Sequence, residues 1–269
     1  MAKLDIEDLA AISARTLDHY DRHAESFWRG TRDHDVSQNI EALLRHIEGK
    51  PPFTILDLGC GPGRDLKAFT DLGHVAVGLE GSERFAAMAR AYSGCEVWQQ
   101  DFLKLALPAG RFDGVFANAA LFHVPTQELP RVLLELRATL KPRGVLFSSN
   151  PRGNNEEGWS DGRYSAFWDL ATWRRYLAAA EFLELAHYYR PAGLPREQQP
   201  WLASVWRRTG KGDDPYPSRP AHPAASGWAL GGSVQCTSKP RLAPLGKGEG
   251  EGGGWVTGRS EGGRMNAEG

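Results

Sequence analysis

The 269-residue sequence lacks several features that would place it in other classes of protein. It has three cysteines, at positions 60, 95 and 236, too few and too scattered for a disulfide framework or a metal site. No apolar run approaches the roughly 18 residues of a membrane-spanning helix. The net charge of −1 gives no basic surplus to attract nucleic acid. The N-terminal residues 1–23 are charged throughout, unlike a signal peptide. We therefore expect a soluble, cytoplasmic protein with no membrane segment, no nucleic-acid partner and no bound metal.

The composition changes sharply after Arg208. Residues 209–269 are rich in glycine and proline and show no apolar periodicity. Such a segment cannot bury enough apolar surface to offset the entropy lost on ordering, so we predict a disordered tail. Isolated Trp228 and Trp255 are unusual in a linker, and an end translated from an altered reading frame is one interpretation.

Residues 51–208 alternate between short apolar runs and amphipathic stretches. The pattern predicts strands at 53–58, 74–80, 95–100, 112–118, 144–149, 182–190 and 201–208. It predicts helices at 64–72, 82–92, 126–140 and 169–180. Repeated strand–helix units imply an α/β fold, a Rossmann-like, seven-stranded, mostly parallel sheet with helices on both faces. The last two strands have no helix between them, so the last strand should run antiparallel.

The stretch "ILDLGCGPGRD", residues 55–65, places a glycine-rich turn between the first strand and the first helix. Such a turn presents backbone N–H groups to a ligand at the carboxyl edge of the sheet. Arg64 and Asp65 follow the last glycine, where a phosphate-binding loop needs Lys-Ser/Thr and a dinucleotide fingerprint needs glycine at 64. Asp57, just before the turn, is a poor neighbour for a pyrophosphate. The turn therefore favours a cofactor that carries positive charge and no phosphate.

With Asp57, Gly59, Gly61 and Gly63, this stretch resembles the D/E-x-G-x-G-x-G turn of the class I S-adenosylmethionine-dependent methyltransferases. The resemblance implies that S-adenosyl-L-methionine is the cofactor and that Asp57 engages its methionine ammonium group. By the same resemblance, the acidic residue that ends the second strand binds the ribose hydroxyls, and the one after the third strand receives the adenine amino group. The expected cofactor-binding residues are Asp57, Gly59, Cys60, Gly61, Gly63, Glu80, Gly81, Ser82, Asp101, Phe102 and Asn118.

The acceptor side is less strongly marked in the sequence. His123 follows the fourth strand, where many small-molecule members of the family place a histidine, and it is the candidate general base. Residues 1–50 are expected to form a helical lid or substrate segment, in which Tyr20 and Trp28 are candidate substrate-binding residues. The polar insert after the fifth strand is read as a long loop, with Arg163 and Tyr164 as further candidates.

The resemblance also narrows the acceptor. Methyltransferases of nucleic-acid bases or glutamine amides carry an [N/D]-P-P-[Y/F] motif after the fourth strand, but residues 118–121 read Asn-Ala-Ala-Leu. We expect in-line methyl transfer to a small molecule, as in the similar tellurite-resistance and quinone-biosynthesis subgroup. The alternative is a non-catalytic cofactor-binding or scaffold protein, while the glycine spacing disfavours a nicotinamide-dependent oxidoreductase. The sequence leaves the acceptor and the oligomeric state open.

Overall fold

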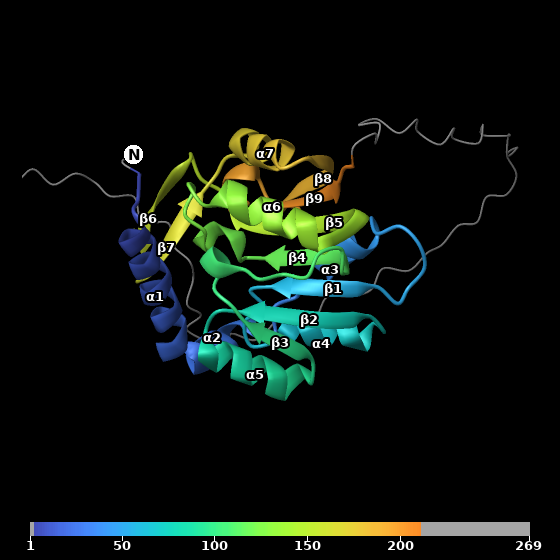
Figure 1. Cartoon of the computed structure of the whole chain (residues 1–269), viewed down its shortest axis with the longest axis horizontal. Coiled ribbons are helices and arrows are strands. Elements are labelled where there is room, and N and C mark those ends of the chain that lie inside the picture. The colour runs from blue at the N-terminus through green and yellow to red at the C-terminus, as the bar shows by residue number, and fades with distance from the viewer. Residues whose placement is uncertain (1–2, 211–269) are drawn as a thin grey trace, which may run out of the picture. The chain divides into compact units, whose positions relative to one another are not determined.

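A computed structural model describes residues 3–210 of the protein. Its centre is a seven-stranded sheet of order β3-β2-β1-β4-β5-β9-β8 (Figure 1). The strands are β1 (Thr54–Leu58), β2 (Val75–Glu80), β3 (Glu96–Gln99), β4 (Phe112–Asn118), β5 (Leu140–Pro151), β8 (Phe182–Arg190) and β9 (Trp201–Arg208). The predicted tail, 209–269, lies outside the described residues except for its first two.

The pairing of the strands confirms the predicted fold class. The first five strands of the chain pair parallel, whereas β9 pairs antiparallel with both β5 and β8. Strands β4, β8 and β9 have the predicted bounds, and β5 is longer than predicted because it begins directly where α6 ends. In the turn of β5, Arg143 adopts a φ of 61°, a left-handed conformation that favours glycine, and its guanidinium pairs with Glu48 at 2.7 Å.

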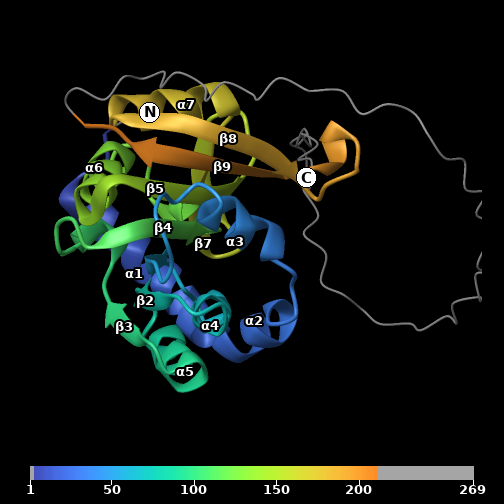
Figure 2. The ribbon, with the colours of Figure 1, turned by 90° about the vertical axis from the view of Figure 1, so that its right-hand side faces the viewer.

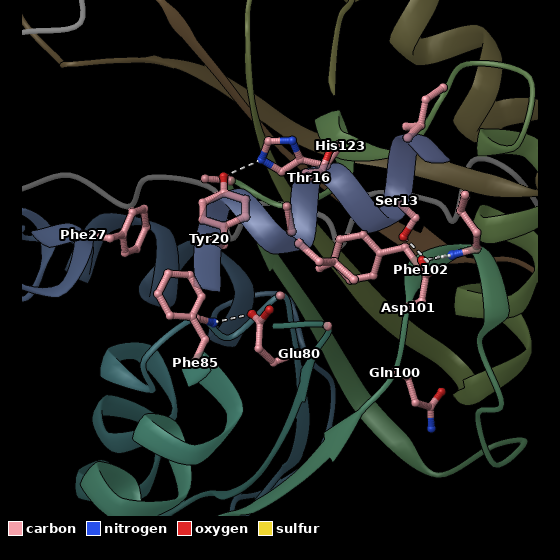
Figure 3. Close-up of a pocket in the computed structure, with 18 residues that line it drawn as sticks. Ser13, Thr16, Tyr20, Phe27, Glu80, Phe85, Gln100, Asp101, Phe102 and His123 are labelled. Atoms are coloured by element: carbon pink, nitrogen blue, oxygen red, sulfur yellow. Dashed lines mark hydrogen bonds between the residues drawn. The ribbon is translucent and has the colours of Figure 1, made fainter. Parts of the chain in front are cut away.

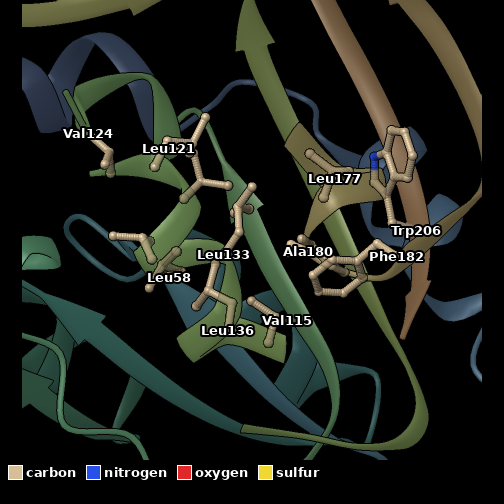
Figure 4. Packing of buried hydrophobic residues seen from close by; sticks show 14 of the residues in the cluster. Leu58, Val115, Leu121, Val124, Leu133, Leu136, Leu177, Ala180, Phe182 and Trp206 are labelled. Atoms are coloured by element: carbon tan, nitrogen blue, oxygen red, sulfur yellow. The ribbon is translucent and has the colours of Figure 1, made fainter. Parts of the chain in front are cut away.

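Helices cover both faces of the sheet (Figure 2). One face carries α3 (Ser37–Leu44), α4 (Arg64–Asp71) and α5 (Glu83–Ser93), and the other carries α6 (Leu129–Thr139) and α7 (Leu170–Ala179). The second face packs α6 leucines and α7 against β4 and β9, with Leu133, Leu136 and Trp206 almost inaccessible to solvent (Figure 4). Burial of this kind is the main favourable contribution to folding, at about 25 cal/mol per Å².

The segment between β5 and α7 corrects the sequence prediction of a loop. Its two strands, β6 (Glu156–Ser160) and β7 (Arg163–Phe167), form an antiparallel hairpin. All of β7 except its last residue is buried, because it lies against α1 and the short 3-10 helix η2 (Leu121–His123). Burial from two sides removes the alternation of polar and apolar residues by which a strand is recognised. The other 3-10 helices are η1 (Phe102–Lys104) and η3 (Arg196–Gln198).

The N-terminal segment contributes α1 (Ile6–Arg22) and α2 (Ala24–Thr31). Helix α1 begins with a capping box between Asp5 and Asp8 and runs along the sheet edge toward which the arrowheads of β1, β2 and β4 point (Figure 1). Backbone groups of Leu4 exchange two hydrogen bonds with the Gln127 side chain and hold the start of this segment. Among residues 3–210, no helix is long and apolar enough to cross a membrane.

Candidate functional site

The glycine turn that follows β1 is built from left-handed residues. Gly59, Gly61 and Gly63 have φ values of 71°, 52° and 95°, a region that glycine enters without steric cost. The N–H groups of Gly59 and Cys60 both donate to the Leu79 carbonyl oxygen, at 2.8 and 3.1 Å, so the turn is fixed against β2. A Cβ on Gly63 would lie 2.8 Å from the backbone of α5. Gly63 is therefore required for helix packing. Gly59 and Gly61 line a cavity, and a Cβ on Gly59 would lie 2.8 Å from Cβ of Ala120.

That cavity lies between the carboxyl edge of the sheet and α1 (Figure 3). It contains about 730 Å³ of empty space, part of it open to solvent. In Figure 3, Tyr20, Phe27 and Phe85 lie at one end, Asp101 and Phe102 lie at the other, and Glu80 lies between them. Of the predicted site residues, those on the cavity wall are Tyr20, Gly59, Gly61, Glu80, Gly81, Asp101, Phe102 and His123.

Glu80, at the end of β2, is a buried carboxylate that backbone groups hold in place. Its two oxygens accept hydrogen bonds from the N–H groups of Gly61, at 2.9 Å, and Ser82, at 2.8 Å. Burial raises the pKa of Glu80 to about 7, although these N–H groups and that of Gly81 favour the charged form. The cavity therefore presents an acceptor of hydrogen bonds that ionises near neutral pH.

Asp101 forms the end of the cavity that lies beyond β3. One carboxylate oxygen accepts the N–H of Leu103 at 2.8 Å, and the other accepts the hydroxyl of Ser13, from α1, at 2.7 Å. Phe102 lies beside it on the cavity wall. This end therefore combines a flat apolar side chain with a carboxylate, which suits a planar ring that carries an N–H donor.

At the opposite end, Tyr20 and His123 form a hydrogen-bonded pair. The Tyr20 hydroxyl lies 2.7 Å from Nε2 of His123, and Nδ1 of His123 lies 2.8 Å from the carbonyl oxygen of Tyr164. Because a carbonyl oxygen only accepts, Nδ1 carries the proton and Nε2 accepts from Tyr20. Burial, reinforced by the charge of Arg163, lowers the pKa of His123 to about 4, so its ring is neutral at physiological pH.

Arg163 and Tyr164, from the β6–β7 hairpin, support this pair from behind. The Arg163 guanidinium carbon lies 5.7 Å from the Tyr20 ring centroid. Tyr164 uses its backbone, whose N–H donates to Thr16 Oγ1 at 3.1 Å and whose carbonyl holds His123. Its ring packs edge-to-face on Trp159. Neither side chain lines the cavity, in contrast to the sequence prediction of two substrate-binding side chains.

Asp57 and Cys60 lie beneath the glycine turn rather than on the cavity wall. Asp57 is 2% exposed and its Oδ2 has no hydrogen-bond partner among the described residues. Burial raises the pKa of Asp57 well above its ordinary value, and the neighbouring Asp65 raises it further. Burial also raises the pKa of Cys60, so its thiol stays protonated, and the side chain packs in the hydrophobic core.

Three other predicted residues are engaged elsewhere. Ser82 is fully buried and caps α5, accepting the Phe85 N–H at 3.1 Å. The Asn118 amide donates to Asp65 and accepts from Asn39, at 3.2 and 2.9 Å, so a polar network within the protein uses it. Trp28 packs on Tyr92, since successive helix residues project about 100° apart and its neighbour Phe27 takes the cavity side.

The chain is similar to known methyltransferases. Residues 55–144 match the family model described as "Methyltransferase domain". This segment is therefore similar to the methyltransferase domain of class I S-adenosylmethionine-dependent enzymes. The matched segment runs from β1 into β5 and contains the glycine turn, Glu80, Asp101 and His123.

Curated methyltransferases from fungi and bacteria match parts of the chain. It is 34% identical over 139 residues to sterol 24-C-methyltransferase ERG6B of Gibberella zeae, a match that covers 47% of this chain and 34% of that one. It is 33% identical over 116 residues to trans-aconitate 2-methyltransferase of Azoarcus sp., covering 42% and 45%, respectively. It is 29% identical over 147 residues to malonyl-[acyl-carrier protein] O-methyltransferase of Enterobacter lignolyticus, covering 54% of each. The chain thus spans about a third to a half of the length of these relatives.

Solved methyltransferases share the fold. The structure of 1,6-didemethyltoxoflavin-N1-methyltransferase from Burkholderia thailandensis, with bound 1,6-didemethyltoxoflavin and S-adenosylhomocysteine, aligns with a TM-score of 0.62 at 21% identity and covers 78% of this chain and 93% of that one. A methyltransferase from Leishmania major aligns with a TM-score of 0.63 at 14% identity, covering 76% and 87%. The agreement over three quarters of the chain extends beyond the matched segment to the N-terminal and C-terminal elements of the class I fold.

The sequence did not reveal most of the cavity wall that α1 supplies. Ile12, Ser13, Thr16 and Leu17 line the cavity, although they belong to no motif. Their spacing places them on one face of a helix, and this spacing is the only sequence signal that points to them. It does not indicate which part of the protein that face contacts. Phe85 and Leu103 were missed for the same reason, since each reads as an ordinary apolar residue.

Proposed function

We propose that the protein transfers a methyl group from S-adenosylmethionine to a small-molecule acceptor. The observation that carries the proposal is one continuous cavity, which joins the glycine turn, Glu80 and Asp101 to the Tyr20–His123 pair. The first group supplies a place for the cofactor and the second faces the position of an acceptor. Both must be adjacent for an in-line displacement.

The charges of the site suit this cofactor. S-adenosylmethionine carries an ammonium and a sulfonium group and no phosphate, and the wall near the glycine turn holds Glu80 above the buried Asp57. The Oδ2 of Asp57, which has no hydrogen-bond partner among the described residues, would be stabilised by a cation bound over the turn. Glu80 has two oxygens for the ribose hydroxyls, and Asp101 can accept the adenine amino group beside Phe102. When bound, the cofactor supplies an activated methyl group.

The N-terminal segment, residues 1–50, acts in this proposal as a lid over the catalytic domain, residues 51–208. Three residues of helix α1 form hydrogen bonds across the cavity: Ser13 with Asp101, Thr16 with the β6–β7 hairpin and Tyr20 with His123. The helix therefore covers the cavity from one end to the other. Asp21 adds hydrogen bonds to Ser82 and to the start of α5. Closure excludes water, which strengthens the electrostatic interactions inside and fixes the acceptor.

Tyr20 and His123 would handle the acceptor's proton. The Tyr20 oxygen donates its own proton to Nε2 of His123, so its lone pairs can accept an O–H or N–H from the acceptor. An acceptor atom becomes strongly acidic as it is methylated. Its proton can then move to Tyr20 while the Tyr20 proton moves to His123, whose ring is neutral at physiological pH and has Nε2 free of a proton.

The acceptor is expected to be a small molecule with a proton on the attacking atom. The names of the relatives include both C- and O-methyltransferases. A proton relay is useful only where the attacking atom loses a proton, as with a hydroxyl or an amine. The apolar lining from Ala119 and Ala120 favours an acceptor with an apolar body.

The test is a metabolite-extract screen with methyl-labelled cofactor, followed by turnover measurements on the product found. Tyr20→Phe and His123→Asn should each lower kcat by about a hundredfold or more, because they interrupt the proton path. Affinity for S-adenosylhomocysteine should change by less than about twofold, since Glu80 and Asp101 remain. Tyr92→Phe, on the outer side of α5, is the matched control and should behave as wild type.

The same experiment separates the alternatives. Unchanged turnover in Tyr20→Phe would rule out the relay. Binding of S-adenosylhomocysteine without any labelled product would favour the non-catalytic cofactor-binding protein. Absence of binding would reject both.

A further inference from the structure

Three aromatic rings from three different helices meet at one end of the cavity. Phe27 of α2 lies 5.1 Å from Phe85 of α5 and 5.8 Å from Tyr20 of α1, measured between ring centroids, and Tyr20 lies 5.5 Å from Phe85. All three line the cavity (Figure 3). The Tyr20 hydroxyl has a role in its hydrogen bond with His123, but nothing in the proposed proton path requires the two phenylalanine rings.

The position of the rings relative to the glycine turn gives them a role. The Phe27 ring edge is 4.0 Å from the point that a Cβ on Gly61 would occupy, and the N–H of Gly61 donates to Glu80. Asp101 and Phe102 lie on the other side of Glu80 (Figure 3). With the ribose at Glu80 and the adenine at Asp101, the sulfur, which is attached to the opposite end of the ribose, falls at the aromatic end.

Aromatic faces attract cations, and more strongly where water is excluded. The ring of Tyr20 already has a cation partner in Arg163, whose guanidinium carbon is 5.7 Å from its centroid. No ion or cation–π partner is recorded for Phe27 or Phe85 among the described residues. Phe85 is almost buried beneath Phe27 and Tyr20, but both phenylalanine rings line the cavity and have no cation of the protein against them, so they are the rings left for a bound cation.

We propose that Phe27 and Phe85 form an aromatic wall that binds the sulfonium group, an inference that rests on the proposed function. The wall makes the site bind the charged methyl donor more tightly than its neutral thioether product. Methyl transfer removes the positive charge from the sulfur. The attraction to the rings is lost at that step, while the contacts of Glu80 and Asp101 with the nucleoside stay the same. The wall thus favours exchange of product for fresh donor.

The experiment measures dissociation constants for three ligands by titration calorimetry: S-adenosylmethionine, S-adenosylhomocysteine and sinefungin, an analogue with an amine in place of the methylated sulfur. Phe27→Leu keeps an apolar side chain but removes the ring. We expect it to raise the dissociation constants of the two cationic ligands by about five- to tenfold, as for the loss of a cation–π contact shielded from water. S-adenosylhomocysteine should change by less than about twofold. Phe27→Tyr should retain the wild-type preference.

Phe102→Leu, at the adenine end, is the matched control, because it removes a ring from the same cavity away from the sulfur. It should raise the dissociation constants of all three ligands by similar factors. An equal effect of Phe27→Leu on all three ligands, or no effect on any, would overturn the aromatic wall while leaving the proposed function intact. Failure of the wild-type protein to bind any of the three would instead reject the proposed function, and the wall with it.

Discussion

At the scale of single residues, Glu80 gives the cavity a titratable hydrogen-bond acceptor. Burial raises its pKa to about 7, and the ribose hydroxyls of a cofactor would be bound by its charged form. Affinity for S-adenosylhomocysteine should therefore rise with pH through this value. If only the ionised form binds, the dissociation constant at pH 6 should be about tenfold that at pH 8. Titration calorimetry at both values measures the ratio.

Glu80→Gln is the control for this pH dependence. The amide keeps the shape of the side chain but has no carboxylate to ionise, so it should bind weakly and with little change between pH 6 and pH 8. A pH dependence that persists in Glu80→Gln would assign the titration to another group.

The residues of the site could be predicted where they belong to a sequence motif. Glu80 and Asp101 lie on the cavity wall, as expected from their places at strand ends. Asn118 also ends its strand, yet Asn39 and Asp65 take up its amide. Asn39 is 79 positions away in the sequence and belongs to no motif. A pattern along the chain gives the position of a side chain on its strand, but not the partners that folding brings to it.

At the scale of elements, α1 makes a close contact with Gly81, the residue that follows β2. A Cβ on Gly81 would lie 2.6 Å from Cδ2 of Leu17, so Gly81→Ala displaces the Leu17 side chain from its place and disturbs the seat of α1 at this point. Overpacking of this kind costs about 1–3 kcal/mol. We expect faster amide exchange over residues 6–22 and a weaker affinity for S-adenosylhomocysteine. Hydrogen-exchange mass spectrometry measures the first and calorimetry the second.

Two variants test whether the clash with α1 causes the effect. Leu17→Ala combined with Gly81→Ala makes room for the new methyl group and should recover part of the protection of α1. Gly30→Ala, in α2, adds a methyl group where no atom lies within 4 Å and should leave exchange in α1 unchanged. Wild-type exchange in Gly81→Ala itself would show that the lid is not seated on this glycine.

Elements with a clear periodicity were predictable. Strands β4, β8 and β9 and the Ser82-capped helix α5 follow from apolar runs and a capping residue, because local pattern and burial agree there. The β6–β7 hairpin did not follow, since its burial comes from α1 and η2, distant in sequence. The predicted function of residues 1–50 as a lid remains a prediction, now with the contacts of α1 to support it.

At the scale of the whole molecule, two buried site residues make stability depend on pH in opposite directions. Glu80 keeps its proton longer when folded, so its contribution to the free energy of unfolding falls as the pH rises from 4.5 to about 7. His123 resists protonation when folded, so its contribution falls as the pH drops from 6.5 to about 4. Each effect amounts to about 3 kcal/mol at its full extent. In the wild-type protein they oppose each other between pH 4.5 and 6.5.

Substitution of either residue should expose the effect of the other. In Glu80→Gln, the free energy of unfolding should rise more steeply between pH 5 and pH 7 than in wild type, because the increase due to His123 is no longer opposed by Glu80. In His123→Asn it should fall over the same interval relative to wild type, and the raised pKa of Asp57 acts in the same direction. Urea unfolding at the two pH values measures both. The informative quantity is the change in the free energy of unfolding with pH, because a loss of packing alone lowers stability equally at both pH values. If the three proteins show the same change with pH, neither residue has the shifted pKa that its burial implies.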